Sequence, residues 1–143
     1  MPSILALDVG SRRIGVARAS SSGPRLATPL CVVEREGVKR DAARLATTCR
    51  EQGATAIVVG LPYDLEGGEG QSARLARQVG DALGALTGLP VHYQDERFTT
   101  VEASARLHAA GLNTRKQRSL IDAAAAAVIL QDWLDGAGAD QAG

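Results

Sequence analysis

This chain of 143 residues contains few aromatic residues and few lysines, and it carries no net charge. Only 3% of the residues are aromatic, and acidic and basic side chains balance to a formal net charge of zero. The composition therefore argues against a protein that stacks bases on an aromatic platform, and a nucleic-acid partner would need a local basic patch. Lys39 and Lys116 are the only lysines, so arginine, which suits phosphate better than lysine does, carries most of the positive charge.

Cysteine and long apolar runs are also scarce. Cys31 and Cys49 follow no metal-ligand spacing and are expected to be free, buried thiols in a reducing compartment. No stretch is long enough to span a membrane and the N-terminus has no secretory pattern, so we expect a cytoplasmic protein without a membrane partner. The chain shows no P-loop and no Ser-His-Asp or Cys-His grouping, and His92, in a short strand, is expected to be structural.

The hydrophobic pattern predicts elements in the order β-β-β-α-β-α-β-α-α. Strands are expected over about 3–9, 13–19, 25–34, 55–59 and 90–94, and helices over about 37–52, 71–87, 100–110 and 120–135. The glycine turn at 10–12 makes the first two strands an antiparallel hairpin.

This order of elements predicts the fold class. If the fourth strand lies beside the first, the sheet order is 3-2-1-4-5, which is the ribonuclease H-like arrangement. The prediction is an α/β fold with a five-stranded mixed sheet and helices on both faces. Residues 1–135 are expected to form a single ribonuclease H-like domain, and residues 136–143 a disordered tail.

Asp8 is the most informative single residue. Residues 4–9 are apolar on both faces of the strand apart from Asp8, a pattern typical of a central strand covered above and below. Burying a carboxylate is unfavourable unless it is paired or binds a metal ion. Asp8 is therefore predicted to hold a cation or a proton for chemistry. The structural alternative is a turn-initiating aspartate that accepts hydrogen bonds from the loop at Gly10.

Further carboxylates converge on the same predicted site. Asp95 and Glu96 end the fifth strand, and Asp122 starts the last helix. Hydrolysis of a phosphodiester needs charge neutralised at the phosphate and an activated water, and two divalent cations do both. Mg²⁺ and Mn²⁺ prefer oxygen ligands. Carboxylates drawn from separate rigid elements therefore predict a metal site.

Each of these acids has a structural alternative. Glu96 could form an ion pair with Arg97 or Arg13, and Asp95 could serve only to orient its neighbours. Ser119-Leu-Ile-Asp122 matches a capping box, in which Asp122 would bond back to the backbone of Ser119. The glycine-containing loop after the fourth strand carries two more acids that could reach the site, Glu66 and Glu69.

Basic residues gather late in the sequence. From 97 to 118 the chain carries Arg97, Arg106, Arg115, Lys116 and Arg118 against Glu102 alone. Residues 113–118 are predicted to form a basic loop immediately before Asp122. A cationic loop beside an acidic metal cluster fits a polyanionic backbone passing over the site, and the alternative is an ordinary solvated loop.

Four stretches of the sequence together resemble a known family. In chain order they are Ala6-Leu-Asp8-Val-Gly10 with Ile14-Gly-Val-Ala17, Val59-Gly60-Leu61-Pro62, Asp95-Glu96-Arg97-Phe98-Thr99-Thr100, and Ile121-Asp122-Ala-Ala-Ala125. The family is YqgF, also called RuvX or Holliday junction resolvase-like proteins. The motifs cover nearly the whole chain, and their combination is specific although each piece is short. One stretch departs mildly, because Tyr63-Asp64-Leu65-Glu66 stands where the family usually has a Leu-Asn-Met-Asp-like run.

The resemblance implies a ribonuclease H-like, metal-dependent nuclease that uses Mg²⁺ or Mn²⁺. Its catalytic and metal-binding acids would fall on Asp8, Glu96 and Asp122. The candidate substrate-binding residues are Arg12, Arg13, Arg97, Arg115, Lys116 and Arg118. The family is associated with 5′-end maturation of the 16S rRNA precursor and, by fold analogy, with Holliday junction resolution. The expected partner is thus an RNA precursor or a branched DNA, and both a monomer and a homodimer remain open.

Two other classes of protein remain as alternatives. Asp8-x-Gly10-Ser11 resembles the first phosphate loop of actin-like and sugar kinases, but those enzymes close two such domains around ATP and this chain has the length of one. The second alternative is a non-catalytic nucleic-acid-binding or regulatory module with the same fold. Among nucleases, symmetric cutting of a junction needs a two-fold dimer, whereas trimming one RNA strand needs one site.

Overall fold

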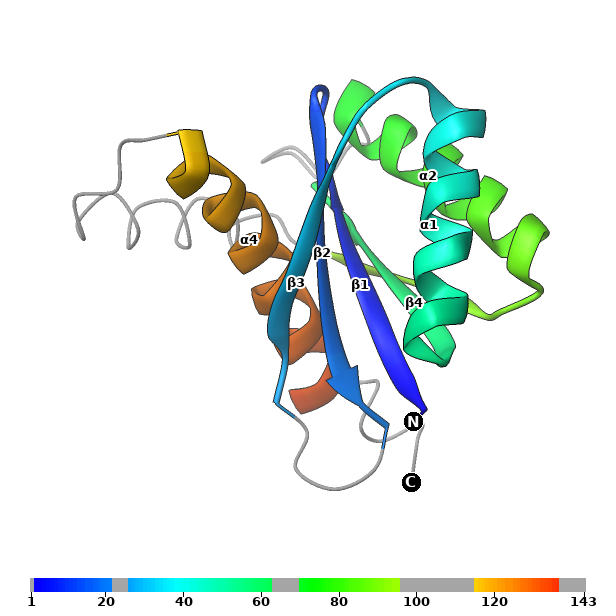
Figure 1. Cartoon of the computed structure of the whole chain (residues 1–143), viewed down its shortest axis with the longest axis vertical. Coiled ribbons are helices and arrows are strands. Elements are labelled where there is room, and N and C mark those ends of the chain that lie inside the picture. Colours follow the sequence, from blue (N-terminus) through cyan, green and yellow to red (C-terminus); the bar gives the residue numbers. More distant parts are fainter. Residues whose placement is uncertain (1, 22–25, 63–69, 96–114, 137–143) are drawn as a thin grey trace.

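A five-stranded sheet organises the molecule (Figure 1). The structure, a computed structural model, describes residues 2–21, 26–62, 70–95 and 115–136. The strands are β1 (Ser3–Val9), β2 (Arg13–Ser20), β3 (Thr28–Glu34), β4 (Ala54–Leu61) and β5 (Val91–Asp95). The helices in these ranges are α1 (Val38–Gln52), α2 (Gln71–Thr87) and α4 (Arg115–Asp135).

The strand order is β3-β2-β1-β4-β5, which confirms the order predicted from the sequence. β1 runs antiparallel to β2 and parallel to β4, and β5 runs parallel to β4. β1 is therefore the central strand, as its apolar pattern predicted. The parallel strands β1, β4 and β5 all end at the same edge of the sheet.

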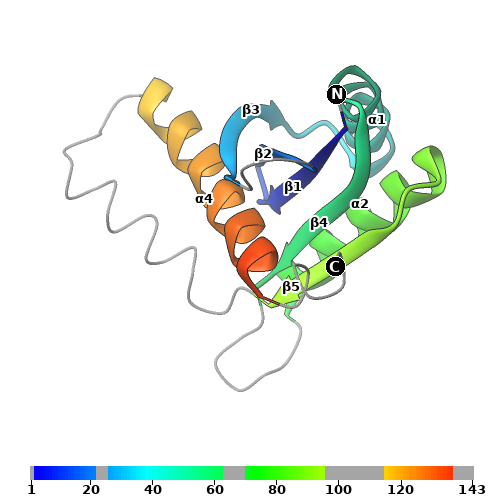
Figure 2. The ribbon, with the colours of Figure 1, turned by 90° about the horizontal axis from the view of Figure 1, so that it is seen from below.

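Helices cover both faces of the sheet, as Figure 2 shows. Leu5, Leu7 and Val9 of β1 pack in the core under α1 and α2. The alternate residues Ile4 and Ala6 pack in a second core under α4. Side chains alternate along a strand, so Asp8 shares the α4 face with Ile4 and Ala6. The same core holds α4 through Ala126, Ile129, Leu130, Trp133 and Leu134.

One boundary prediction is wrong. Helix α4 begins at Arg115 rather than at 120, so residues 115–118 belong to a helix and not to a basic loop. The charged run suggested a loop, but Arg, Lys and Gln are all good helix formers and no glycine or proline interrupts them. The predicted helix over 100–110 and residues 137–143 of the predicted tail lie outside the described residues.

Cys31 and Cys49 are free thiols, as expected, but only Cys49 is buried. Cys31 is partly buried, because β3 is an edge strand of the sheet. His92 packs against Trp133 with ring centroids 5.1 Å apart, in keeping with a structural role. Across the described segments, no helix has the length and apolar character needed to cross a membrane.

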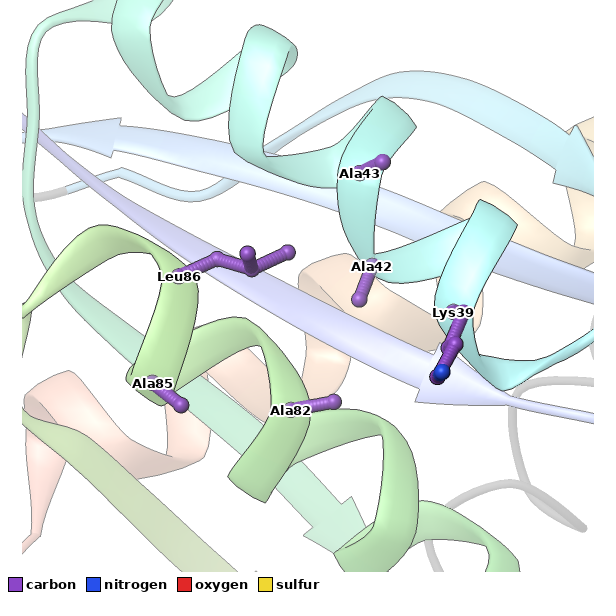
Figure 3. Close-up of a pocket in the computed structure, with 6 residues that line it drawn as sticks. All are labelled: Lys39, Ala42, Ala43, Ala82, Ala85 and Leu86. Atoms are coloured by element: carbon purple, nitrogen blue, oxygen red, sulfur yellow. The ribbon is translucent and has the colours of Figure 1, made fainter.

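An apolar hollow of about 400 Å³ lies between α1 and α2, on the side of the sheet away from α4 (Figure 3). Five small or aliphatic side chains and one lysine line it, namely Lys39, Ala42, Ala43, Ala82, Ala85 and Leu86. Leu86 reaches from α2 toward α1 in the close-up, and most of its surface is exposed. The hollow is separated from Asp8 by the sheet, so it takes no part in the site described next.

Candidate active site

Asp8 lies one residue before the end of the central strand and faces α4. The apolar surroundings and the nearby Asp122 raise the pKa of this carboxyl to about 6, with desolvation the larger cause and the negative charge of Asp122 the second. The turn after it is closed by the backbone, because the Gly10 amide donates to the carbonyl oxygen of Arg13 (2.8 Å). Asp8 thus has the depth expected of a functional carboxylate.

Gly15 brings α4 close to Asp8. It lies directly opposite Asp8 in the β1–β2 register and is buried. A Cβ atom added to Gly15 would stand 1.9 Å from the carbonyl oxygen of Asp122 and 2.4 Å from its carbonyl carbon. Only glycine allows the helix backbone to pack this tightly, and the close approach carries Asp122 to the side of Asp8.

Arg13 is the counter-ion of Asp122. Its Nε donates to Asp122 Oδ2 over 2.6 Å, and the two side chains are 30% and 27% exposed. The sequence suggested Arg13 as a substrate-binding residue or as a partner of Glu96. Its partner in the structure is one of the proposed catalytic acids. The site therefore combines two neighbouring carboxylates with one guanidinium that compensates part of their charge.

The position of Asp122 within α4 shows whether this residue is part of an N-terminal capping box or a carboxylate of the site. Since α4 begins at Arg115, Ser119 lies inside the helix and does not cap its N-terminus. The capping-box alternative is therefore wrong.

Beside Asp122 a polar hollow of about 220 Å³ opens at the end of the hairpin, lined by Gly10, Ser11, Arg12, Arg13 and Asp122.

The other candidate residues lie in different elements, and some of them lie outside the described residues. Asp95 is exposed at the end of β5, opposite Leu61 of β4. The candidates Arg115, Lys116 and Arg118 lie in the first turn of α4. Glu66, Glu69, Glu96 and Arg97 lie outside the described residues. Within the segments that the structure describes, no group of three His, Cys, Asp or Glu side chains could hold a metal ion.

Sequence reasoning missed two residues next to the hairpin turn, Arg35 and Asp41. Asp41 is fully buried at the start of α1, and Arg35 donates a hydrogen bond to the Gly10 carbonyl (3.3 Å). A signal was present, because Asp41 lies four residues before Leu45 on the apolar stripe of α1. A charged residue on a buried stripe requires a partner.

Comparisons with known proteins point to a single family. The model of the RuvX family, described as Holliday junction resolvase, matches residues 2–136. A protein of Anaeromyxobacter sp. (strain Fw109-5) is 48% identical over 132 residues, covering 92% of this chain and 96% of the relative. One of Thermosynechococcus vestitus is 42% identical over 135 residues, covering 94% and 89%. Both relatives are provisionally named pre-16S rRNA nucleases.

A solved structure supports the fold assignment. RuvC of Thermus thermophilus superimposes with a TM-score of 0.54 at 17% identity, covering 90% of this chain and 91% of that one. This likeness confirms the ribonuclease H-like class that the strand order predicted. On the family match and the close relatives together, this chain belongs to the RuvX family.

Proposed function

We propose that this protein is a divalent-metal-dependent nuclease that matures the 5′ end of the 16S rRNA precursor in the cytoplasm. The observation that carries the proposal is the pairing of Asp8 and Asp122. A central strand and a separate helix force two carboxylates together, and the pKa of one is raised to about 6. Perturbed carboxylates at the end of a strand are a common mark of a functional site. The names of the relatives support the rRNA substrate.

The residues present fit a hard divalent cation. Asp8 and Asp122 offer only oxygen donors, which Mg²⁺ and Mn²⁺ prefer, and a cation between them would relieve the repulsion that raises the pKa of Asp8. We propose Glu96 as the third ligand, since it directly follows Asp95 at the edge where the parallel strands end. A bound ion of this kind neutralises charge on a phosphate and activates a water.

The chain's own residues would hold the substrate. Arg12 is exposed on the hairpin turn, and Arg13 lies beside Asp122 at the polar hollow. Arg115, Lys116 and Arg118 are proposed to bind phosphates further along, where the positive end of the α4 dipole adds to their charge. Arg97 is proposed to act with them.

Metal binding and cleavage test this proposal together. We expect Mn²⁺ or Mg²⁺ to raise the melting temperature and Asp8→Asn to abolish most of that rise. Asp122→Asn should reduce cleavage of a 16S precursor 5′ fragment at least about 10²-fold, the scale of losing one preorganised electrostatic group. Asp132→Asn, exposed on the same helix, is the matched control and should cleave at the wild-type rate. A wild-type rate in Asp122→Asn would remove this residue from the site.

Holliday junction resolution is the second candidate, favoured by the description of the family model and the likeness to RuvC. The two functions differ in geometry, because symmetric cleavage of a four-way junction needs two active sites related by a two-fold axis. We expect the rRNA fragment to be cut and the four-way DNA junction to be cut poorly. Paired symmetric cuts in the junction, together with a dimer in solution, would favour resolution instead.

A further inference from the structure

A buried ion pair stands directly behind the hairpin turn of the site. Asp41 of α1 is fully buried and accepts three hydrogen bonds: from Arg35 Nε (2.8 Å), from the Glu36 amide (2.9 Å) and from Arg44 Nη2 (2.9 Å). Burial alone would raise the pKa of Asp41, but these donors outweigh it and hold the pKa below its ordinary value. Asp41 is therefore a fixed negative charge at neutral pH.

Arg35 connects this charge to the turn. Its Nη1 donates to the carbonyl oxygen of Gly10 (3.3 Å), and its backbone amide donates to the carbonyl oxygen of Arg12 (2.9 Å). The Arg35 side chain is only 10% exposed. One residue thus binds the carbonyl groups on both sides of Ser11. Asp41 in turn orients the guanidinium that makes the first of these contacts.

The turn is the part of the chain that sets the geometry of the site. It begins two residues after Asp8, carries Arg12, and ends at Arg13, whose guanidinium is bonded to Asp122 (2.6 Å). The turn is closed by the Gly10–Arg13 backbone hydrogen bond. A displacement of the turn would move Arg13, and with it the charge that compensates Asp122 beside Asp8.

We propose that Arg35 and Asp41 are positioning residues of the nuclease site: they fix the β1–β2 turn and so set the spacing between Asp8, Arg13 and Asp122. This inference rests on the proposed function only for its effect on metal and substrate. Neither residue is exposed enough to contact a substrate, so both act through the turn.

Arg44 provides a control that distinguishes positioning of the turn from general stabilisation of the fold. Like Arg35 it donates to Asp41, and it also donates to the Glu34 carbonyl, but neither of these hydrogen bonds reaches the turn. Arg35→Lys and Arg44→Lys are therefore matched variants that keep the charge and disturb the same carboxylate. A lysine ammonium lacks the planar fork of arginine, so at position 35 it cannot hold Asp41 and the Gly10 carbonyl in the present geometry.

Two measurements on the whole protein test the proposal, both well below the melting temperature of each variant. The first is the Mn²⁺ dissociation constant from calorimetry. We expect Arg35→Lys to raise it about 10- to 100-fold, the usual effect of disturbing groups that orient metal ligands, and Arg44→Lys to leave it near the wild-type value. Equal dissociation constants in wild type and Arg35→Lys would overturn the proposal.

The second measurement does not need metal. Amide hydrogen exchange should show the Gly10 amide exchanging at least about tenfold faster in Arg35→Lys, with the Val58 amide of the neighbouring strand unchanged. Arg44→Lys should leave both rates unchanged. If wild type binds no Mn²⁺, the proposed function fails, and the exchange rate of Gly10 alone decides the role of Arg35. An unchanged Gly10 rate in Arg35→Lys would refute it.

Discussion

Asp8 experiences two unfavourable effects in the absence of metal. The apolar faces of the central strand remove water from its carboxylate, and the neighbouring Asp122 repels its negative charge. Arg13 compensates Asp122 rather than Asp8, because its hydrogen bond is to Asp122. The raised pKa therefore means that ionisation of Asp8 lowers the free energy of unfolding of the protein.

This imbalance predicts the pH dependence of stability in metal-free protein. The folded-state pKa of about 6 lies above the ordinary aspartate pKa of 3.8, so between these two pH values the folded protein holds a proton that the unfolded chain has released. Stability from this group is therefore fully present below about pH 4 and is lost as the pH rises to about 6. Asp8→Asn cannot ionise, so it should be more stable than wild type at neutral pH, by at most roughly 3 kcal/mol.

Urea unfolding in EDTA across this pH range provides the measurement. The gap between Asp8→Asn and wild type should close as the pH falls from about 6 to about 4. Asp132→Asn, which changes an exposed carboxylate on α4, is the reference substitution and is measured under the same conditions. A constant gap for Asp8→Asn would mean that Asp8 titrates normally.

Single residues were predictable from the sequence where their local pattern was sufficient. Asp8 was identified because apolar neighbours on both faces make a carboxylate stand out. The partner of Arg13 was not, because Asp122 lies 109 residues away and only the packing of α4 brings the two together. Asp41 carried a local signal, but its proposed role acts through Arg35, which contacts a turn about thirty residues before Asp41.

At the scale of elements, the contact between β2 and α4 depends on the absence of one side chain. Gly15→Ala would place a methyl group 1.9 Å from a backbone oxygen of α4, and a helix backbone cannot rotate away as a side chain can. We expect the helix to shift outward and the free energy of unfolding to fall by about 1–3 kcal/mol, as overpacked cores do. The Mn²⁺ affinity should fall as well, since Asp122 would move away from Asp8.

Gly70→Ala is the control for this effect. Its added Cβ meets nothing within 4 Å, and the residue precedes α2 rather than contacting α4. It should lower stability by less than about 1 kcal/mol, the range of an N-cap change, and leave Mn²⁺ affinity unchanged. Denaturant unfolding and calorimetry measure both quantities. A Gly15→Ala protein with wild-type metal affinity would show that the tight β2–α4 contact does not position Asp122.

Most elements were predictable because their signals are local. Periodic apolar residues ending at a glycine placed α2 over 71–87, and Gly53 ends α1 with a positive φ of 64°. The predicted start of α4 was too late. The buried residues that mark this helix in the sequence begin at Ala123, after Asp122, and the first turn of the helix lies before them. Periodicity detects the buried part of a helix and not a polar extension of it.

For the molecule as a whole, the groups proposed to be functional lie at one end of the sheet. The hairpin turn, the carboxyl ends of β4 and β5, and the start of α1 lie toward that end, and Figure 1 shows the start of α2 there as well. The strand order could be predicted from the sequence because an antiparallel hairpin followed by crossover connections leaves few topologies. The distance between the site's acids could not, because it depends on how closely α4 approaches Gly15.

We expect the start of α4 to hold nucleic acid at this end of the sheet. Arg115 and Lys116 open α4, seven and six residues before Asp122, so their charges and the helix dipole favour a phosphate backbone near the acids. Arg115→Ala with Lys116→Ala should weaken substrate binding and reduce the slope of log affinity against log salt by about one unit per lost phosphate contact. Turnover at saturating substrate should change little, because neither residue is assigned to the chemistry.

Arg50→Ala is the matched control for charge. Arg50 lies in the last turn of α1, which leads to the start of β4 at the opposite end of the sheet, and its side chain bonds Thr47 of the same helix. Its removal should leave both affinity and salt slope at the wild-type values. Filter binding over a series of salt concentrations, with single-turnover cleavage, distinguishes the outcomes. Unchanged binding with a slower cleavage step in the double variant would instead place Arg115 or Lys116 at the phosphate that is cut.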